Sequence, residues 1–385
     1  MDIVLADLTI EGNVVKALMH APKNGFFYLL DRNTGKLLSA EPFAEVNWAS
    51  KVDLATGRPV EIPGSRYEDG LATIFPSPFG AHSWHAMSYN PGTGLVYIPT
   101  MHVAAQFADT GIDLAKWRSP DWRGDLPTEG IGVAWPSPLP ARSDGVVGTL
   151  QAWDPVKKQR VWEVVLPGPW NPGTMTSAGN LVFQGRADGH LVAYQAGTGQ
   201  ELWKADLGLG ISAPPVTYAV NGRQYVALLV GWGGAGAALG GPGLAAHGWA
   251  YGAQTRRLIA FSLEGKAALP PSSPPVVPTP IGAKDFPVDV AAADRGAVVY
   301  SGRCGFCHGG EAVSAGMAPD LRASAVVLSA SGFANALRDG TRRAKGMPQF
   351  SEFSDQRLDD LRHYIRQRAE LAVAAAAAAG APTTP

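Results

Sequence analysis

Two cysteines and a histidine at fixed spacing could do the most specific chemistry in this sequence. The run Cys304-Gly305-Phe306-Cys307-His308 uses both cysteines of the 385-residue chain. A C-x-x-C-H run is typical of c-type haem attachment, in which two thioethers fix the porphyrin and the adjacent imidazole binds the iron. We therefore predict a covalent haem on Cys304 and Cys307, with His308 as one axial ligand.

The second axial ligand is predicted to be Met347, which lies 39 residues after His308 (347 − 308) in the segment Gly346-Met347-Pro348. The ligand must come from the opposite wall of the haem, and Met317 lies too near the motif to reach it. A His/Met pair is the ligation of electron-transfer cytochromes and raises the reduction potential. The alternative is that Met347 packs as an ordinary core side chain.

Three other uses of the two cysteines stay open on the sequence alone. A structural zinc site needs four ligands, and only His308 and a distant imidazole could join the thiols. A redox dithiol is expected between a strand and a helix, whereas glycine and alanine dominate this region. A disulfide also fits the spacing.

Composition narrows the class of protein. The formal net charge is −1 and 17% of the residues are charged, so nothing indicates a nucleic-acid partner or an anionic membrane surface. No apolar run approaches the length of a membrane span. The residues after Met1 do not form a signal peptide. Covalent haem attachment in bacteria is expected outside the cytoplasm, so we expect a periplasmic protein whose signal peptide lies upstream.

Residues 1–265 are predicted to be all-β, because short apolar runs alternate with Gly, Asn and Asp turns. An internal repeat makes Ala152 equivalent to Ala193, a period of 41 residues (193 − 152) that is typical of propeller blades. We expect Trp162 and Trp203 to dock between neighbouring blades. A β-sandwich with coincidental Trp spacing is the alternative. The predicted strands are Phe27–Leu30, Val96–Pro99, Leu181–Gln184, Leu191–Tyr194, Tyr225–Val230 and Leu258–Phe261.

The composition changes after the β region. Residues 266–290 form a Pro-rich linker that we expect to be semi-rigid and extended. Residues 291–372 are predicted to be a small all-α cytochrome c domain, and residues 373–385 a disordered tail. The predicted helices are Ala291–Tyr300, a helix around Phe333–Arg338, and one that begins after an N-cap at Ser354 and ends near Ala369.

A propeller with Trp-bearing repeats, a Pro-rich linker and a C-terminal cytochrome c together resemble the quinohaemoprotein alcohol dehydrogenases. The strings that carry the resemblance, in the family's order, are Ala21–Arg32, Val46–Ser50, Gly80–His85 and Gly231–Gly234. The resemblance implies that residues 1–265 are the C-terminal portion of an eight-bladed propeller that binds pyrroloquinoline quinone (PQQ). It also implies that Lys23, Asn47 and Trp48 contact PQQ.

The same resemblance implies the activity. Alcohols would be oxidised, and electrons would pass from PQQ to haem c and on to a blue-copper protein, a cytochrome or a quinone. Lys23 would stabilise the negative charge that develops on the quinone carbonyl, although most lysines are simply solvated. Asn47 would hydrogen-bond the quinone edge, and Trp48 would offer a flat face and an N–H, although most tryptophans pack in the core.

One departure from the family limits this interpretation. The family's calcium ligands and catalytic base belong to an N-terminal half-propeller that the chain lacks, so no catalytic residue is named here. We expect the chain to be inactive without that half. A hypothesis of another class is a non-enzymatic electron-transfer cytochrome with a degenerate propeller as a docking domain. Residues 106–133 are too irregular to interpret.

Overall fold

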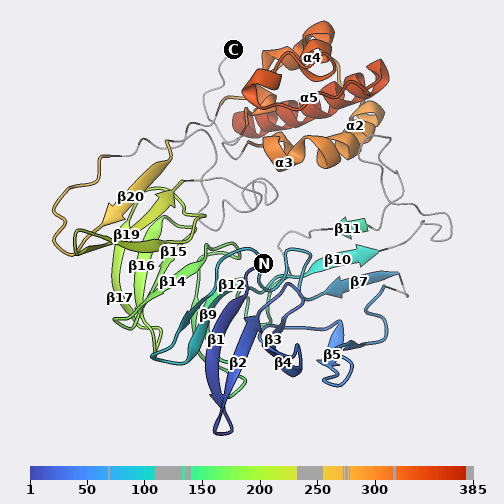
Figure 1. The fold of residues 1–385 in the computed structure, drawn as a ribbon. Coiled ribbons are helices and arrows are strands. Elements are labelled where there is room, and N and C mark those ends of the chain that lie inside the picture. Colours follow the sequence, from blue (N-terminus) through green and yellow to red (C-terminus); the bar gives the residue numbers. More distant parts are fainter. Residues whose placement is uncertain are drawn as a thin grey trace.

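The computed structural model describes residues 1–67, 70–108, 132–134, 140–231, 255–271, 273, 276, 278–314 and 318–378. Met317 and the string Trp232–Gly234 lie outside these residues, as does most of 106–133. The described chain folds into a set of antiparallel sheets followed by a helical domain (Figure 1).

Four antiparallel sheets follow one another along the chain, each built from strands that are close in sequence. In spatial order, the first contains β1 (Val4–Ile10), β2 (Asn13–His20), β3 (Phe26–Asp31) and β4 (Leu37–Pro42). The second contains β13 (Gln159–Val165), β12 (Gly148–Asp154), β9 (Leu95–Met101) and β8 (Ser88–Asn90). The third contains β14 (Thr174–Ser177), β15 (Leu181–Gly185), β16 (His190–Gln195) and β17 (Glu201–Asp206). The fourth contains β18 (Val216–Val220), β19 (Arg223–Val230) and β20 (Arg257–Phe261).

Two smaller sheets are formed by strands that lie between β4 and β12 in the sequence. One pairs β5 (Ala49–Val52) with β6 (Pro59–Glu61), and the other runs β11 (Gly132–Ala134), β10 (Ala105–Ala108), β7 (Leu71–Ile74). All six predicted strand segments lie within strands of the structure, in β3, β9, β15, β16, β19 and β20.

The repeat predicted from the sequence is visible in the strand register. Ala152 pairs with Trp162 and Ala193 pairs with Trp203, and in both sheets a bulge follows the alanine directly. A bulge adds local twist at the same point of each blade. The prediction of equivalent blades is therefore confirmed at the level of individual residue pairs.

Apolar clusters join each sheet to the next. One cluster packs the first sheet against the second, another packs the second against the third, and a third packs the third against the fourth. Consecutive face-to-face packing of more than two sheets is the arrangement of propeller blades and not of a two-sheet sandwich. The fold is a partial propeller, as predicted.

The two repeat tryptophans dock to different depths. Trp162 is 9% exposed, its Nε1 donates to the Ala196 oxygen at 2.9 Å, and its ring fills the space beside Gly199 of the next sheet. Trp203 meets Phe261 of the fourth sheet edge-on, with ring centroids 5.4 Å apart, but it remains 42% exposed. The docking predicted for both residues is complete for Trp162 and partial for Trp203.

The linker is fastened at both ends by arginines. Arg257 at the start of β20 donates to the carbonyl oxygens of Pro270 and Pro271, at 2.9 and 2.8 Å. At the other end, Arg366 donates to the Ile281 oxygen at 2.6 Å. The first anchor belongs to the last blade and the second to the helical domain.

The helical domain contains four α-helices and four short 3₁₀ turns among the described residues. The α-helices are α2 (Val290–Arg303), α3 (Gly305–His308), α4 (Ala330–Leu337) and α5 (Asp355–Ala378). The 3₁₀ turns are η2 (Gly310–Ala312), η3 (Leu321–Ala323), η4 (Ala325–Leu328) and η5 (Arg343–Lys345). The three predicted helices are present as α2, α4 and α5, and the Ser354 hydroxyl accepts from the Arg357 N–H as the predicted N-cap of α5.

α2 and α5 cross at Gly296. A Cβ at this position would lie 2.0 Å from the backbone oxygen of Asp360, so the crossing requires glycine.

α5 continues to Ala378, so residues 373–378 are helical and not part of a disordered tail. Alanine has the highest helix propensity, and a run of alanines extends an existing helix at little cost.

Candidate haem and quinone sites

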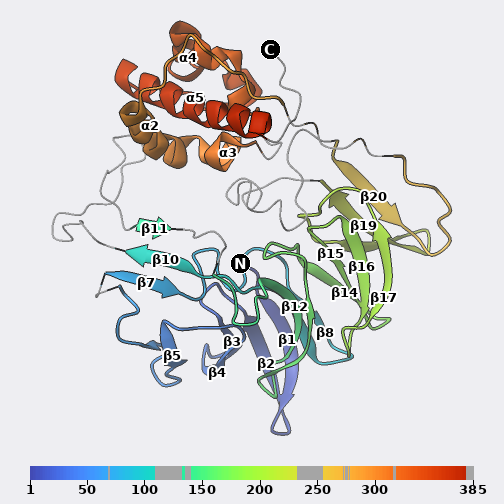
Figure 2. The same cartoon turned by 180° about the vertical axis from the view of Figure 1, so that it is seen from behind.

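The haem motif forms a short helix on the side of the helical domain that faces the sheets (Figures 1 and 2). Cys304 is the N-cap of α3 and Cys307 lies within it. Both thiols are free, which speaks against the disulfide alternative. Within the described ranges, no group of three or more His, Cys, Asp or Glu side chains is placed to hold a metal ion.

His308 is positioned as an iron ligand should be. Its side chain is 8% exposed, and its Nδ1–H donates to the Pro319 oxygen at 2.8 Å, which leaves the Nε2 lone pair available. Burial lowers the pKa of His308, so the neutral ring is favoured. A neutral imidazole with one nitrogen fixed by a backbone carbonyl is the arrangement found in metal-ligating histidines.

Met347 is brought to the same core as the haem motif. Met347 and Cys304 both pack against one apolar cluster of the helical domain, and neither is fully buried. The buried members of that cluster are Tyr300, Ala312, Val327, Phe333, Ala336, Leu337, Phe353, Leu358, Leu361 and Ile365. The structure therefore places Met347 and Cys304 on one core, although axial ligation by Met347 stays a prediction.

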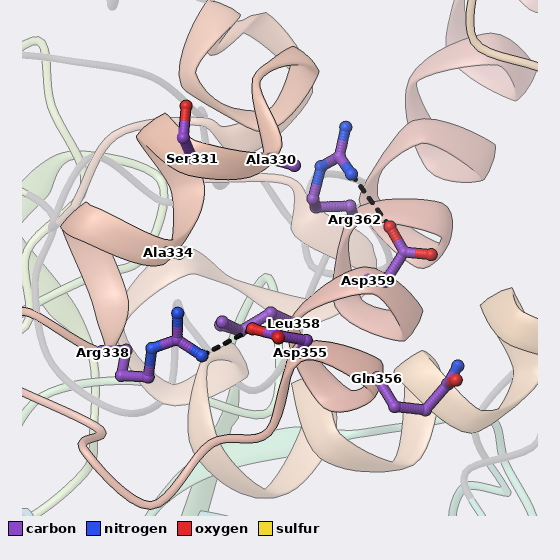
Figure 3. Close-up of a pocket in the computed structure, with 9 residues that line it drawn as sticks. All are labelled: Ala330, Ser331, Ala334, Arg338, Asp355, Gln356, Leu358, Asp359 and Arg362. Carbon is purple, nitrogen blue, oxygen red and sulfur yellow. Dashed lines mark hydrogen bonds and ion pairs between the residues drawn. The ribbon is translucent and has the colours of Figure 1, made fainter.

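One hollow of the helical domain lies away from the haem motif. It has a volume of about 450 Å³ and is lined by α4 and α5 (Figure 3). Arg338 pairs with Asp355 and Arg362 pairs with Asp359 across its rim. Because both arginines are neutralised by carboxylates, we assign no ligand to this hollow.

Lys23 lies in the turn between β2 and β3, against the loop that contains the string Gly80–His85. Its side chain is exposed, and its Nζ donates to the Pro78 oxygen at 2.9 Å. The Lys23 oxygen in turn accepts from the Ala81 N–H at 3.0 Å. Gly80 has φ +89°, and a Cβ there would lie 2.6 Å from the Lys23 Cα, so this close approach requires glycine.

The side chains of Asn47 and Trp48 form hydrogen bonds with nearby backbone atoms. The Asn47 side chain donates to the Thr73 oxygen and accepts from the Phe75 N–H, both at 2.8 Å. Trp48 Nε1 donates to the oxygen of Asn24, the residue after Lys23, at 3.1 Å. Trp48 therefore supports the turn that presents Lys23, whereas Asn47 fixes the backbone at Thr73 and Phe75, and the sequence revealed neither role.

A residue that the sequence analysis did not single out is Trp84. Its indole is 52% exposed, stacks on His85 and meets Trp170 edge-on, with ring centroids 5.3 and 4.8 Å apart. Its loop is fixed by His82, whose ring nitrogens contact the oxygens of Ala21 and His85 at 2.6 and 2.5 Å. The sequence indicated that the string Gly80–His85 belongs to the site. It did not indicate which residue of that string is exposed.

Two family models match separate parts of the chain. The model described as "Glucose/ethanol/alcohol dehydrogenase, beta-propeller domain" matches residues 142–226, and "Cytochrome C oxidase, cbb3-type, subunit III" matches residues 291–365. Quinohemoprotein alcohol dehydrogenase ADH IIB of Pseudomonas putida is 44% identical over 371 residues, which cover 95% of this chain and 51% of the relative.

Solved structures agree with these matches. The quinohemoprotein alcohol dehydrogenase ADHIIG of Pseudomonas putida HK5 has a TM-score of 0.78 at 36% identity, over 96% of this chain and 54% of that one. The quinohemoprotein alcohol dehydrogenase of Comamonas testosteroni has a TM-score of 0.74 at 35% identity, over 96% of this chain and 53% of that one. Over nearly its whole length, the chain is homologous to about half of a quinohaemoprotein alcohol dehydrogenase. It spans about half the length of the curated relatives it matches.

The cofactors of the quinohaemoprotein alcohol dehydrogenases are PQQ and haem c, and calcium is typical of the family. The haem residues of this chain fit that assignment through two free thiols and one neutral, oriented imidazole. The exposed Lys23 cation and the exposed Trp84 face fit a flat, anionic quinone. For calcium, the part of the chain that the structure describes offers no cluster of three acidic, His or Cys side chains.

The Met347 assignment can be tested with a matched pair of variants. In M347L the volume is kept but the thioether is lost, so we expect a lower haem reduction potential and a changed oxidised spectrum. M317L removes the competing methionine and should leave both unchanged. A spectroelectrochemical titration measures the two variants. If the M317L variant shows the shift instead, the axial assignment is wrong.

The structure describes no helix that combines the length and the apolarity needed to cross a membrane.

Proposed function

We propose that this chain is the electron-exit half of a periplasmic, PQQ- and haem c-dependent alcohol dehydrogenase. The observation that carries the proposal is that one chain holds both an exposed Lys23, hydrogen-bonded to the loop that leads to the exposed Trp84, and a C-x-x-C-H helix with an oriented His308. When bound, PQQ accepts two electrons from an alcohol, and haem c passes electrons on singly to an external acceptor.

Each residue of the proposed quinone site has a separate task. Lys23 places a cation where negative charge develops on the quinone oxygen, and a fixed cation in a water-poor site stabilises such charge strongly. Trp84 offers a flat face for stacking. We retain Asn47 and Trp48 as proposed PQQ contacts, and Trp48 has the further task of holding the turn at Asn24 that carries Lys23.

A second polypeptide segment is proposed to complete the ring. The outer face of the fourth sheet carries Val216, Tyr218, Leu229 and Leu258, which are between 44% and 73% exposed. Leu229 and Leu258 pair directly across β19 and β20. An apolar face of this kind on a blade is ordinarily covered by the neighbouring blade. The family's other half-propeller would cover it, and would supply the calcium ligands and the catalytic base.

The function is tested by reconstitution. The haem-bearing chain, PQQ and calcium are mixed with ethanol, with or without the region of Pseudomonas putida ADH IIB that lies outside the match. We expect haem reduction, followed by absorbance, only when both halves are present. Ascorbate serves as a control that the haem can be reduced.

Both contrary outcomes are informative. Haem reduction by ethanol with this chain alone would overturn the half-site proposal. In the second outcome, the haem is reduced by ascorbate but not by ethanol when both halves are assembled. That result would overturn the proposal that the assembled protein is an alcohol dehydrogenase. The chain would then be a c-type cytochrome with a docking propeller.

Lys23 is tested by charge removal at constant size. In K23Q the chain loses a charge-assisted contact to PQQ, and we expect the PQQ affinity of the assembled halves to fall about tenfold or more. K36Q removes another exposed lysine of the first sheet, just before β4, and should leave the affinity unchanged. A fluorescence titration with PQQ measures both, and equal affinities would remove Lys23 from the site.

A further inference from the structure

A basic segment lies beside the predicted axial methionine. Residues 341–346, between α4 and Met347, carry Arg342, Arg343 and Lys345, and all three side chains are exposed. Among the described residues none of the three forms an ion pair, and Arg343 donates only to Gln349, at 3.4 Å. Other arginines of the domain are paired with carboxylates, namely Arg295, Arg322, Arg338, Arg362, Arg366 and Arg368. The charge of this segment is therefore not cancelled locally.

The basic segment leads directly into Met347 and is hydrogen-bonded to it. The Met347 N–H donates to the Arg342 oxygen at 3.4 Å, and the Gly346 N–H donates to the Arg343 oxygen at 2.9 Å. Met347 itself packs on the core shared with Cys304. A partner that contacts the basic segment would therefore lie close to the iron ligand proposed above.

Residues 341–346 contain three cations and no acidic residue, in a chain whose formal net charge is −1. A local positive patch orients an approaching anionic partner toward that patch. The orientation places the partner beside the haem and not beside the sheets.

We propose that residues 341–346 are the docking surface for a soluble electron-acceptor protein with an acidic face. The inference rests on the proposed haem function. One electron leaves the ferrous haem, which becomes ferric, and the acceptor is reduced by that one electron. Anionic lipid headgroups are ordinarily bound by clusters of about four to eight Lys or Arg, more than this segment offers. A neutral membrane quinone would gain nothing from three cations.

The experiment compares two variants of the haem-bearing full chain. R342Q/R343Q/K345Q neutralises the basic segment. K36Q/K51Q/R58Q removes the same charge from exposed positions near β4 and β5, at the far end of the molecule from the helices (Figure 1). The haem is reduced with ascorbate and its re-oxidation is followed with anionic hexacyanoferrate(III), with cationic tris(phenanthroline)cobalt(III), and with an acidic blue-copper protein.

At low ionic strength, R342Q/R343Q/K345Q should slow re-oxidation by hexacyanoferrate(III) and by the blue-copper protein about three- to tenfold, and speed re-oxidation by the cobalt complex. K36Q/K51Q/R58Q should change each rate by less than about twofold, and high salt should remove the differences. A second readout does not involve electron transfer. Redox-inert hexacyanocobaltate(III) should shift the amide NMR signals of residues 341–347 in the parent chain but not in R342Q/R343Q/K345Q.

The outcomes separate this inference from the function on which it rests. Absence of a haem spectrum in the parent chain would contradict the proposed function itself. A normal haem spectrum with equal rates in the two variants would overturn the docking surface. Binding of the parent chain, but not of R342Q/R343Q/K345Q, to phosphatidylglycerol vesicles, with unchanged re-oxidation rates, would assign the segment to a membrane and also overturn the proposal.

Discussion

The double variant C304A/C307A is expected to contain no covalently bound haem. Both thioether positions are removed, and His308 alone would hold haem only through a bond that denaturation breaks. The measurement is haem staining of the denatured chain on a gel, with its intact mass. This is the largest effect we expect on function, because every electron-transfer property proposed here depends on that haem.

Single substitutions provide the matched control. C304A and C307A each leave one thiol, so we expect a reduced but detectable yield of covalent haem from each. A double variant that stains as strongly as the parent would show that the haem is attached elsewhere. Parent chain without any covalent haem, made in a host that attaches haem c, would refute the assignment of the motif.

Trp162→Ala is expected to cause the largest loss of stability in the propeller, about 3–5 kcal/mol. The substitution leaves a cavity between the second and third sheets and removes the hydrogen bond from Nε1 to the Ala196 oxygen. Urea unfolding, followed by the fluorescence of the remaining tryptophans, gives the free energy of unfolding of the propeller. The helical domain is followed separately by haem absorbance, because two domains need not unfold together.

Trp203 is the internal control, since it occupies the equivalent position of the next repeat. It is 42% exposed, so Trp203→Ala should cost roughly 1–2 kcal/mol, well below the cost at Trp162. Trp162→Phe keeps an aromatic ring but loses the N–H, and should fall between the two. Equal losses at Trp162 and Trp203 would mean that the docking seen in the structure does not set the stability.

The parts of the fold that could be predicted are those set by short stretches of sequence. The repeat could be predicted because the Ala152–Trp162 and Ala193–Trp203 pairs each lie in one β-hairpin, whose two strands are close in sequence. The haem motif could be predicted for the same reason, because its two thiols and its imidazole lie within a few residues of one another in the sequence. The end of α5 was placed too early because the alanine run was interpreted as a tail, although alanine favours helix.

The proposed quinone site was harder to predict because its contacts join distant segments. Lys23 meets Pro78, 55 residues away, and whether Asn47 faces a cofactor or the backbone of Thr73 depends on how those segments pack. A family string indicates that a segment matters but not which side chain is exposed. The prominence of Trp84 over Trp48 therefore became visible only in the folded chain.

The two arginine anchors of the linker have a consequence for the kinetics of electron transfer. Between Pro271 and Ile281 lie ten peptide steps (281 − 271), which can span at most about 35 Å. A tether of that length keeps the haem domain near the sheets at an effective concentration in the millimolar range. If PQQ and haem c are bound as proposed, electron transfer between them would be a first-order event within one assembled molecule, and its rate should not change when the protein is diluted.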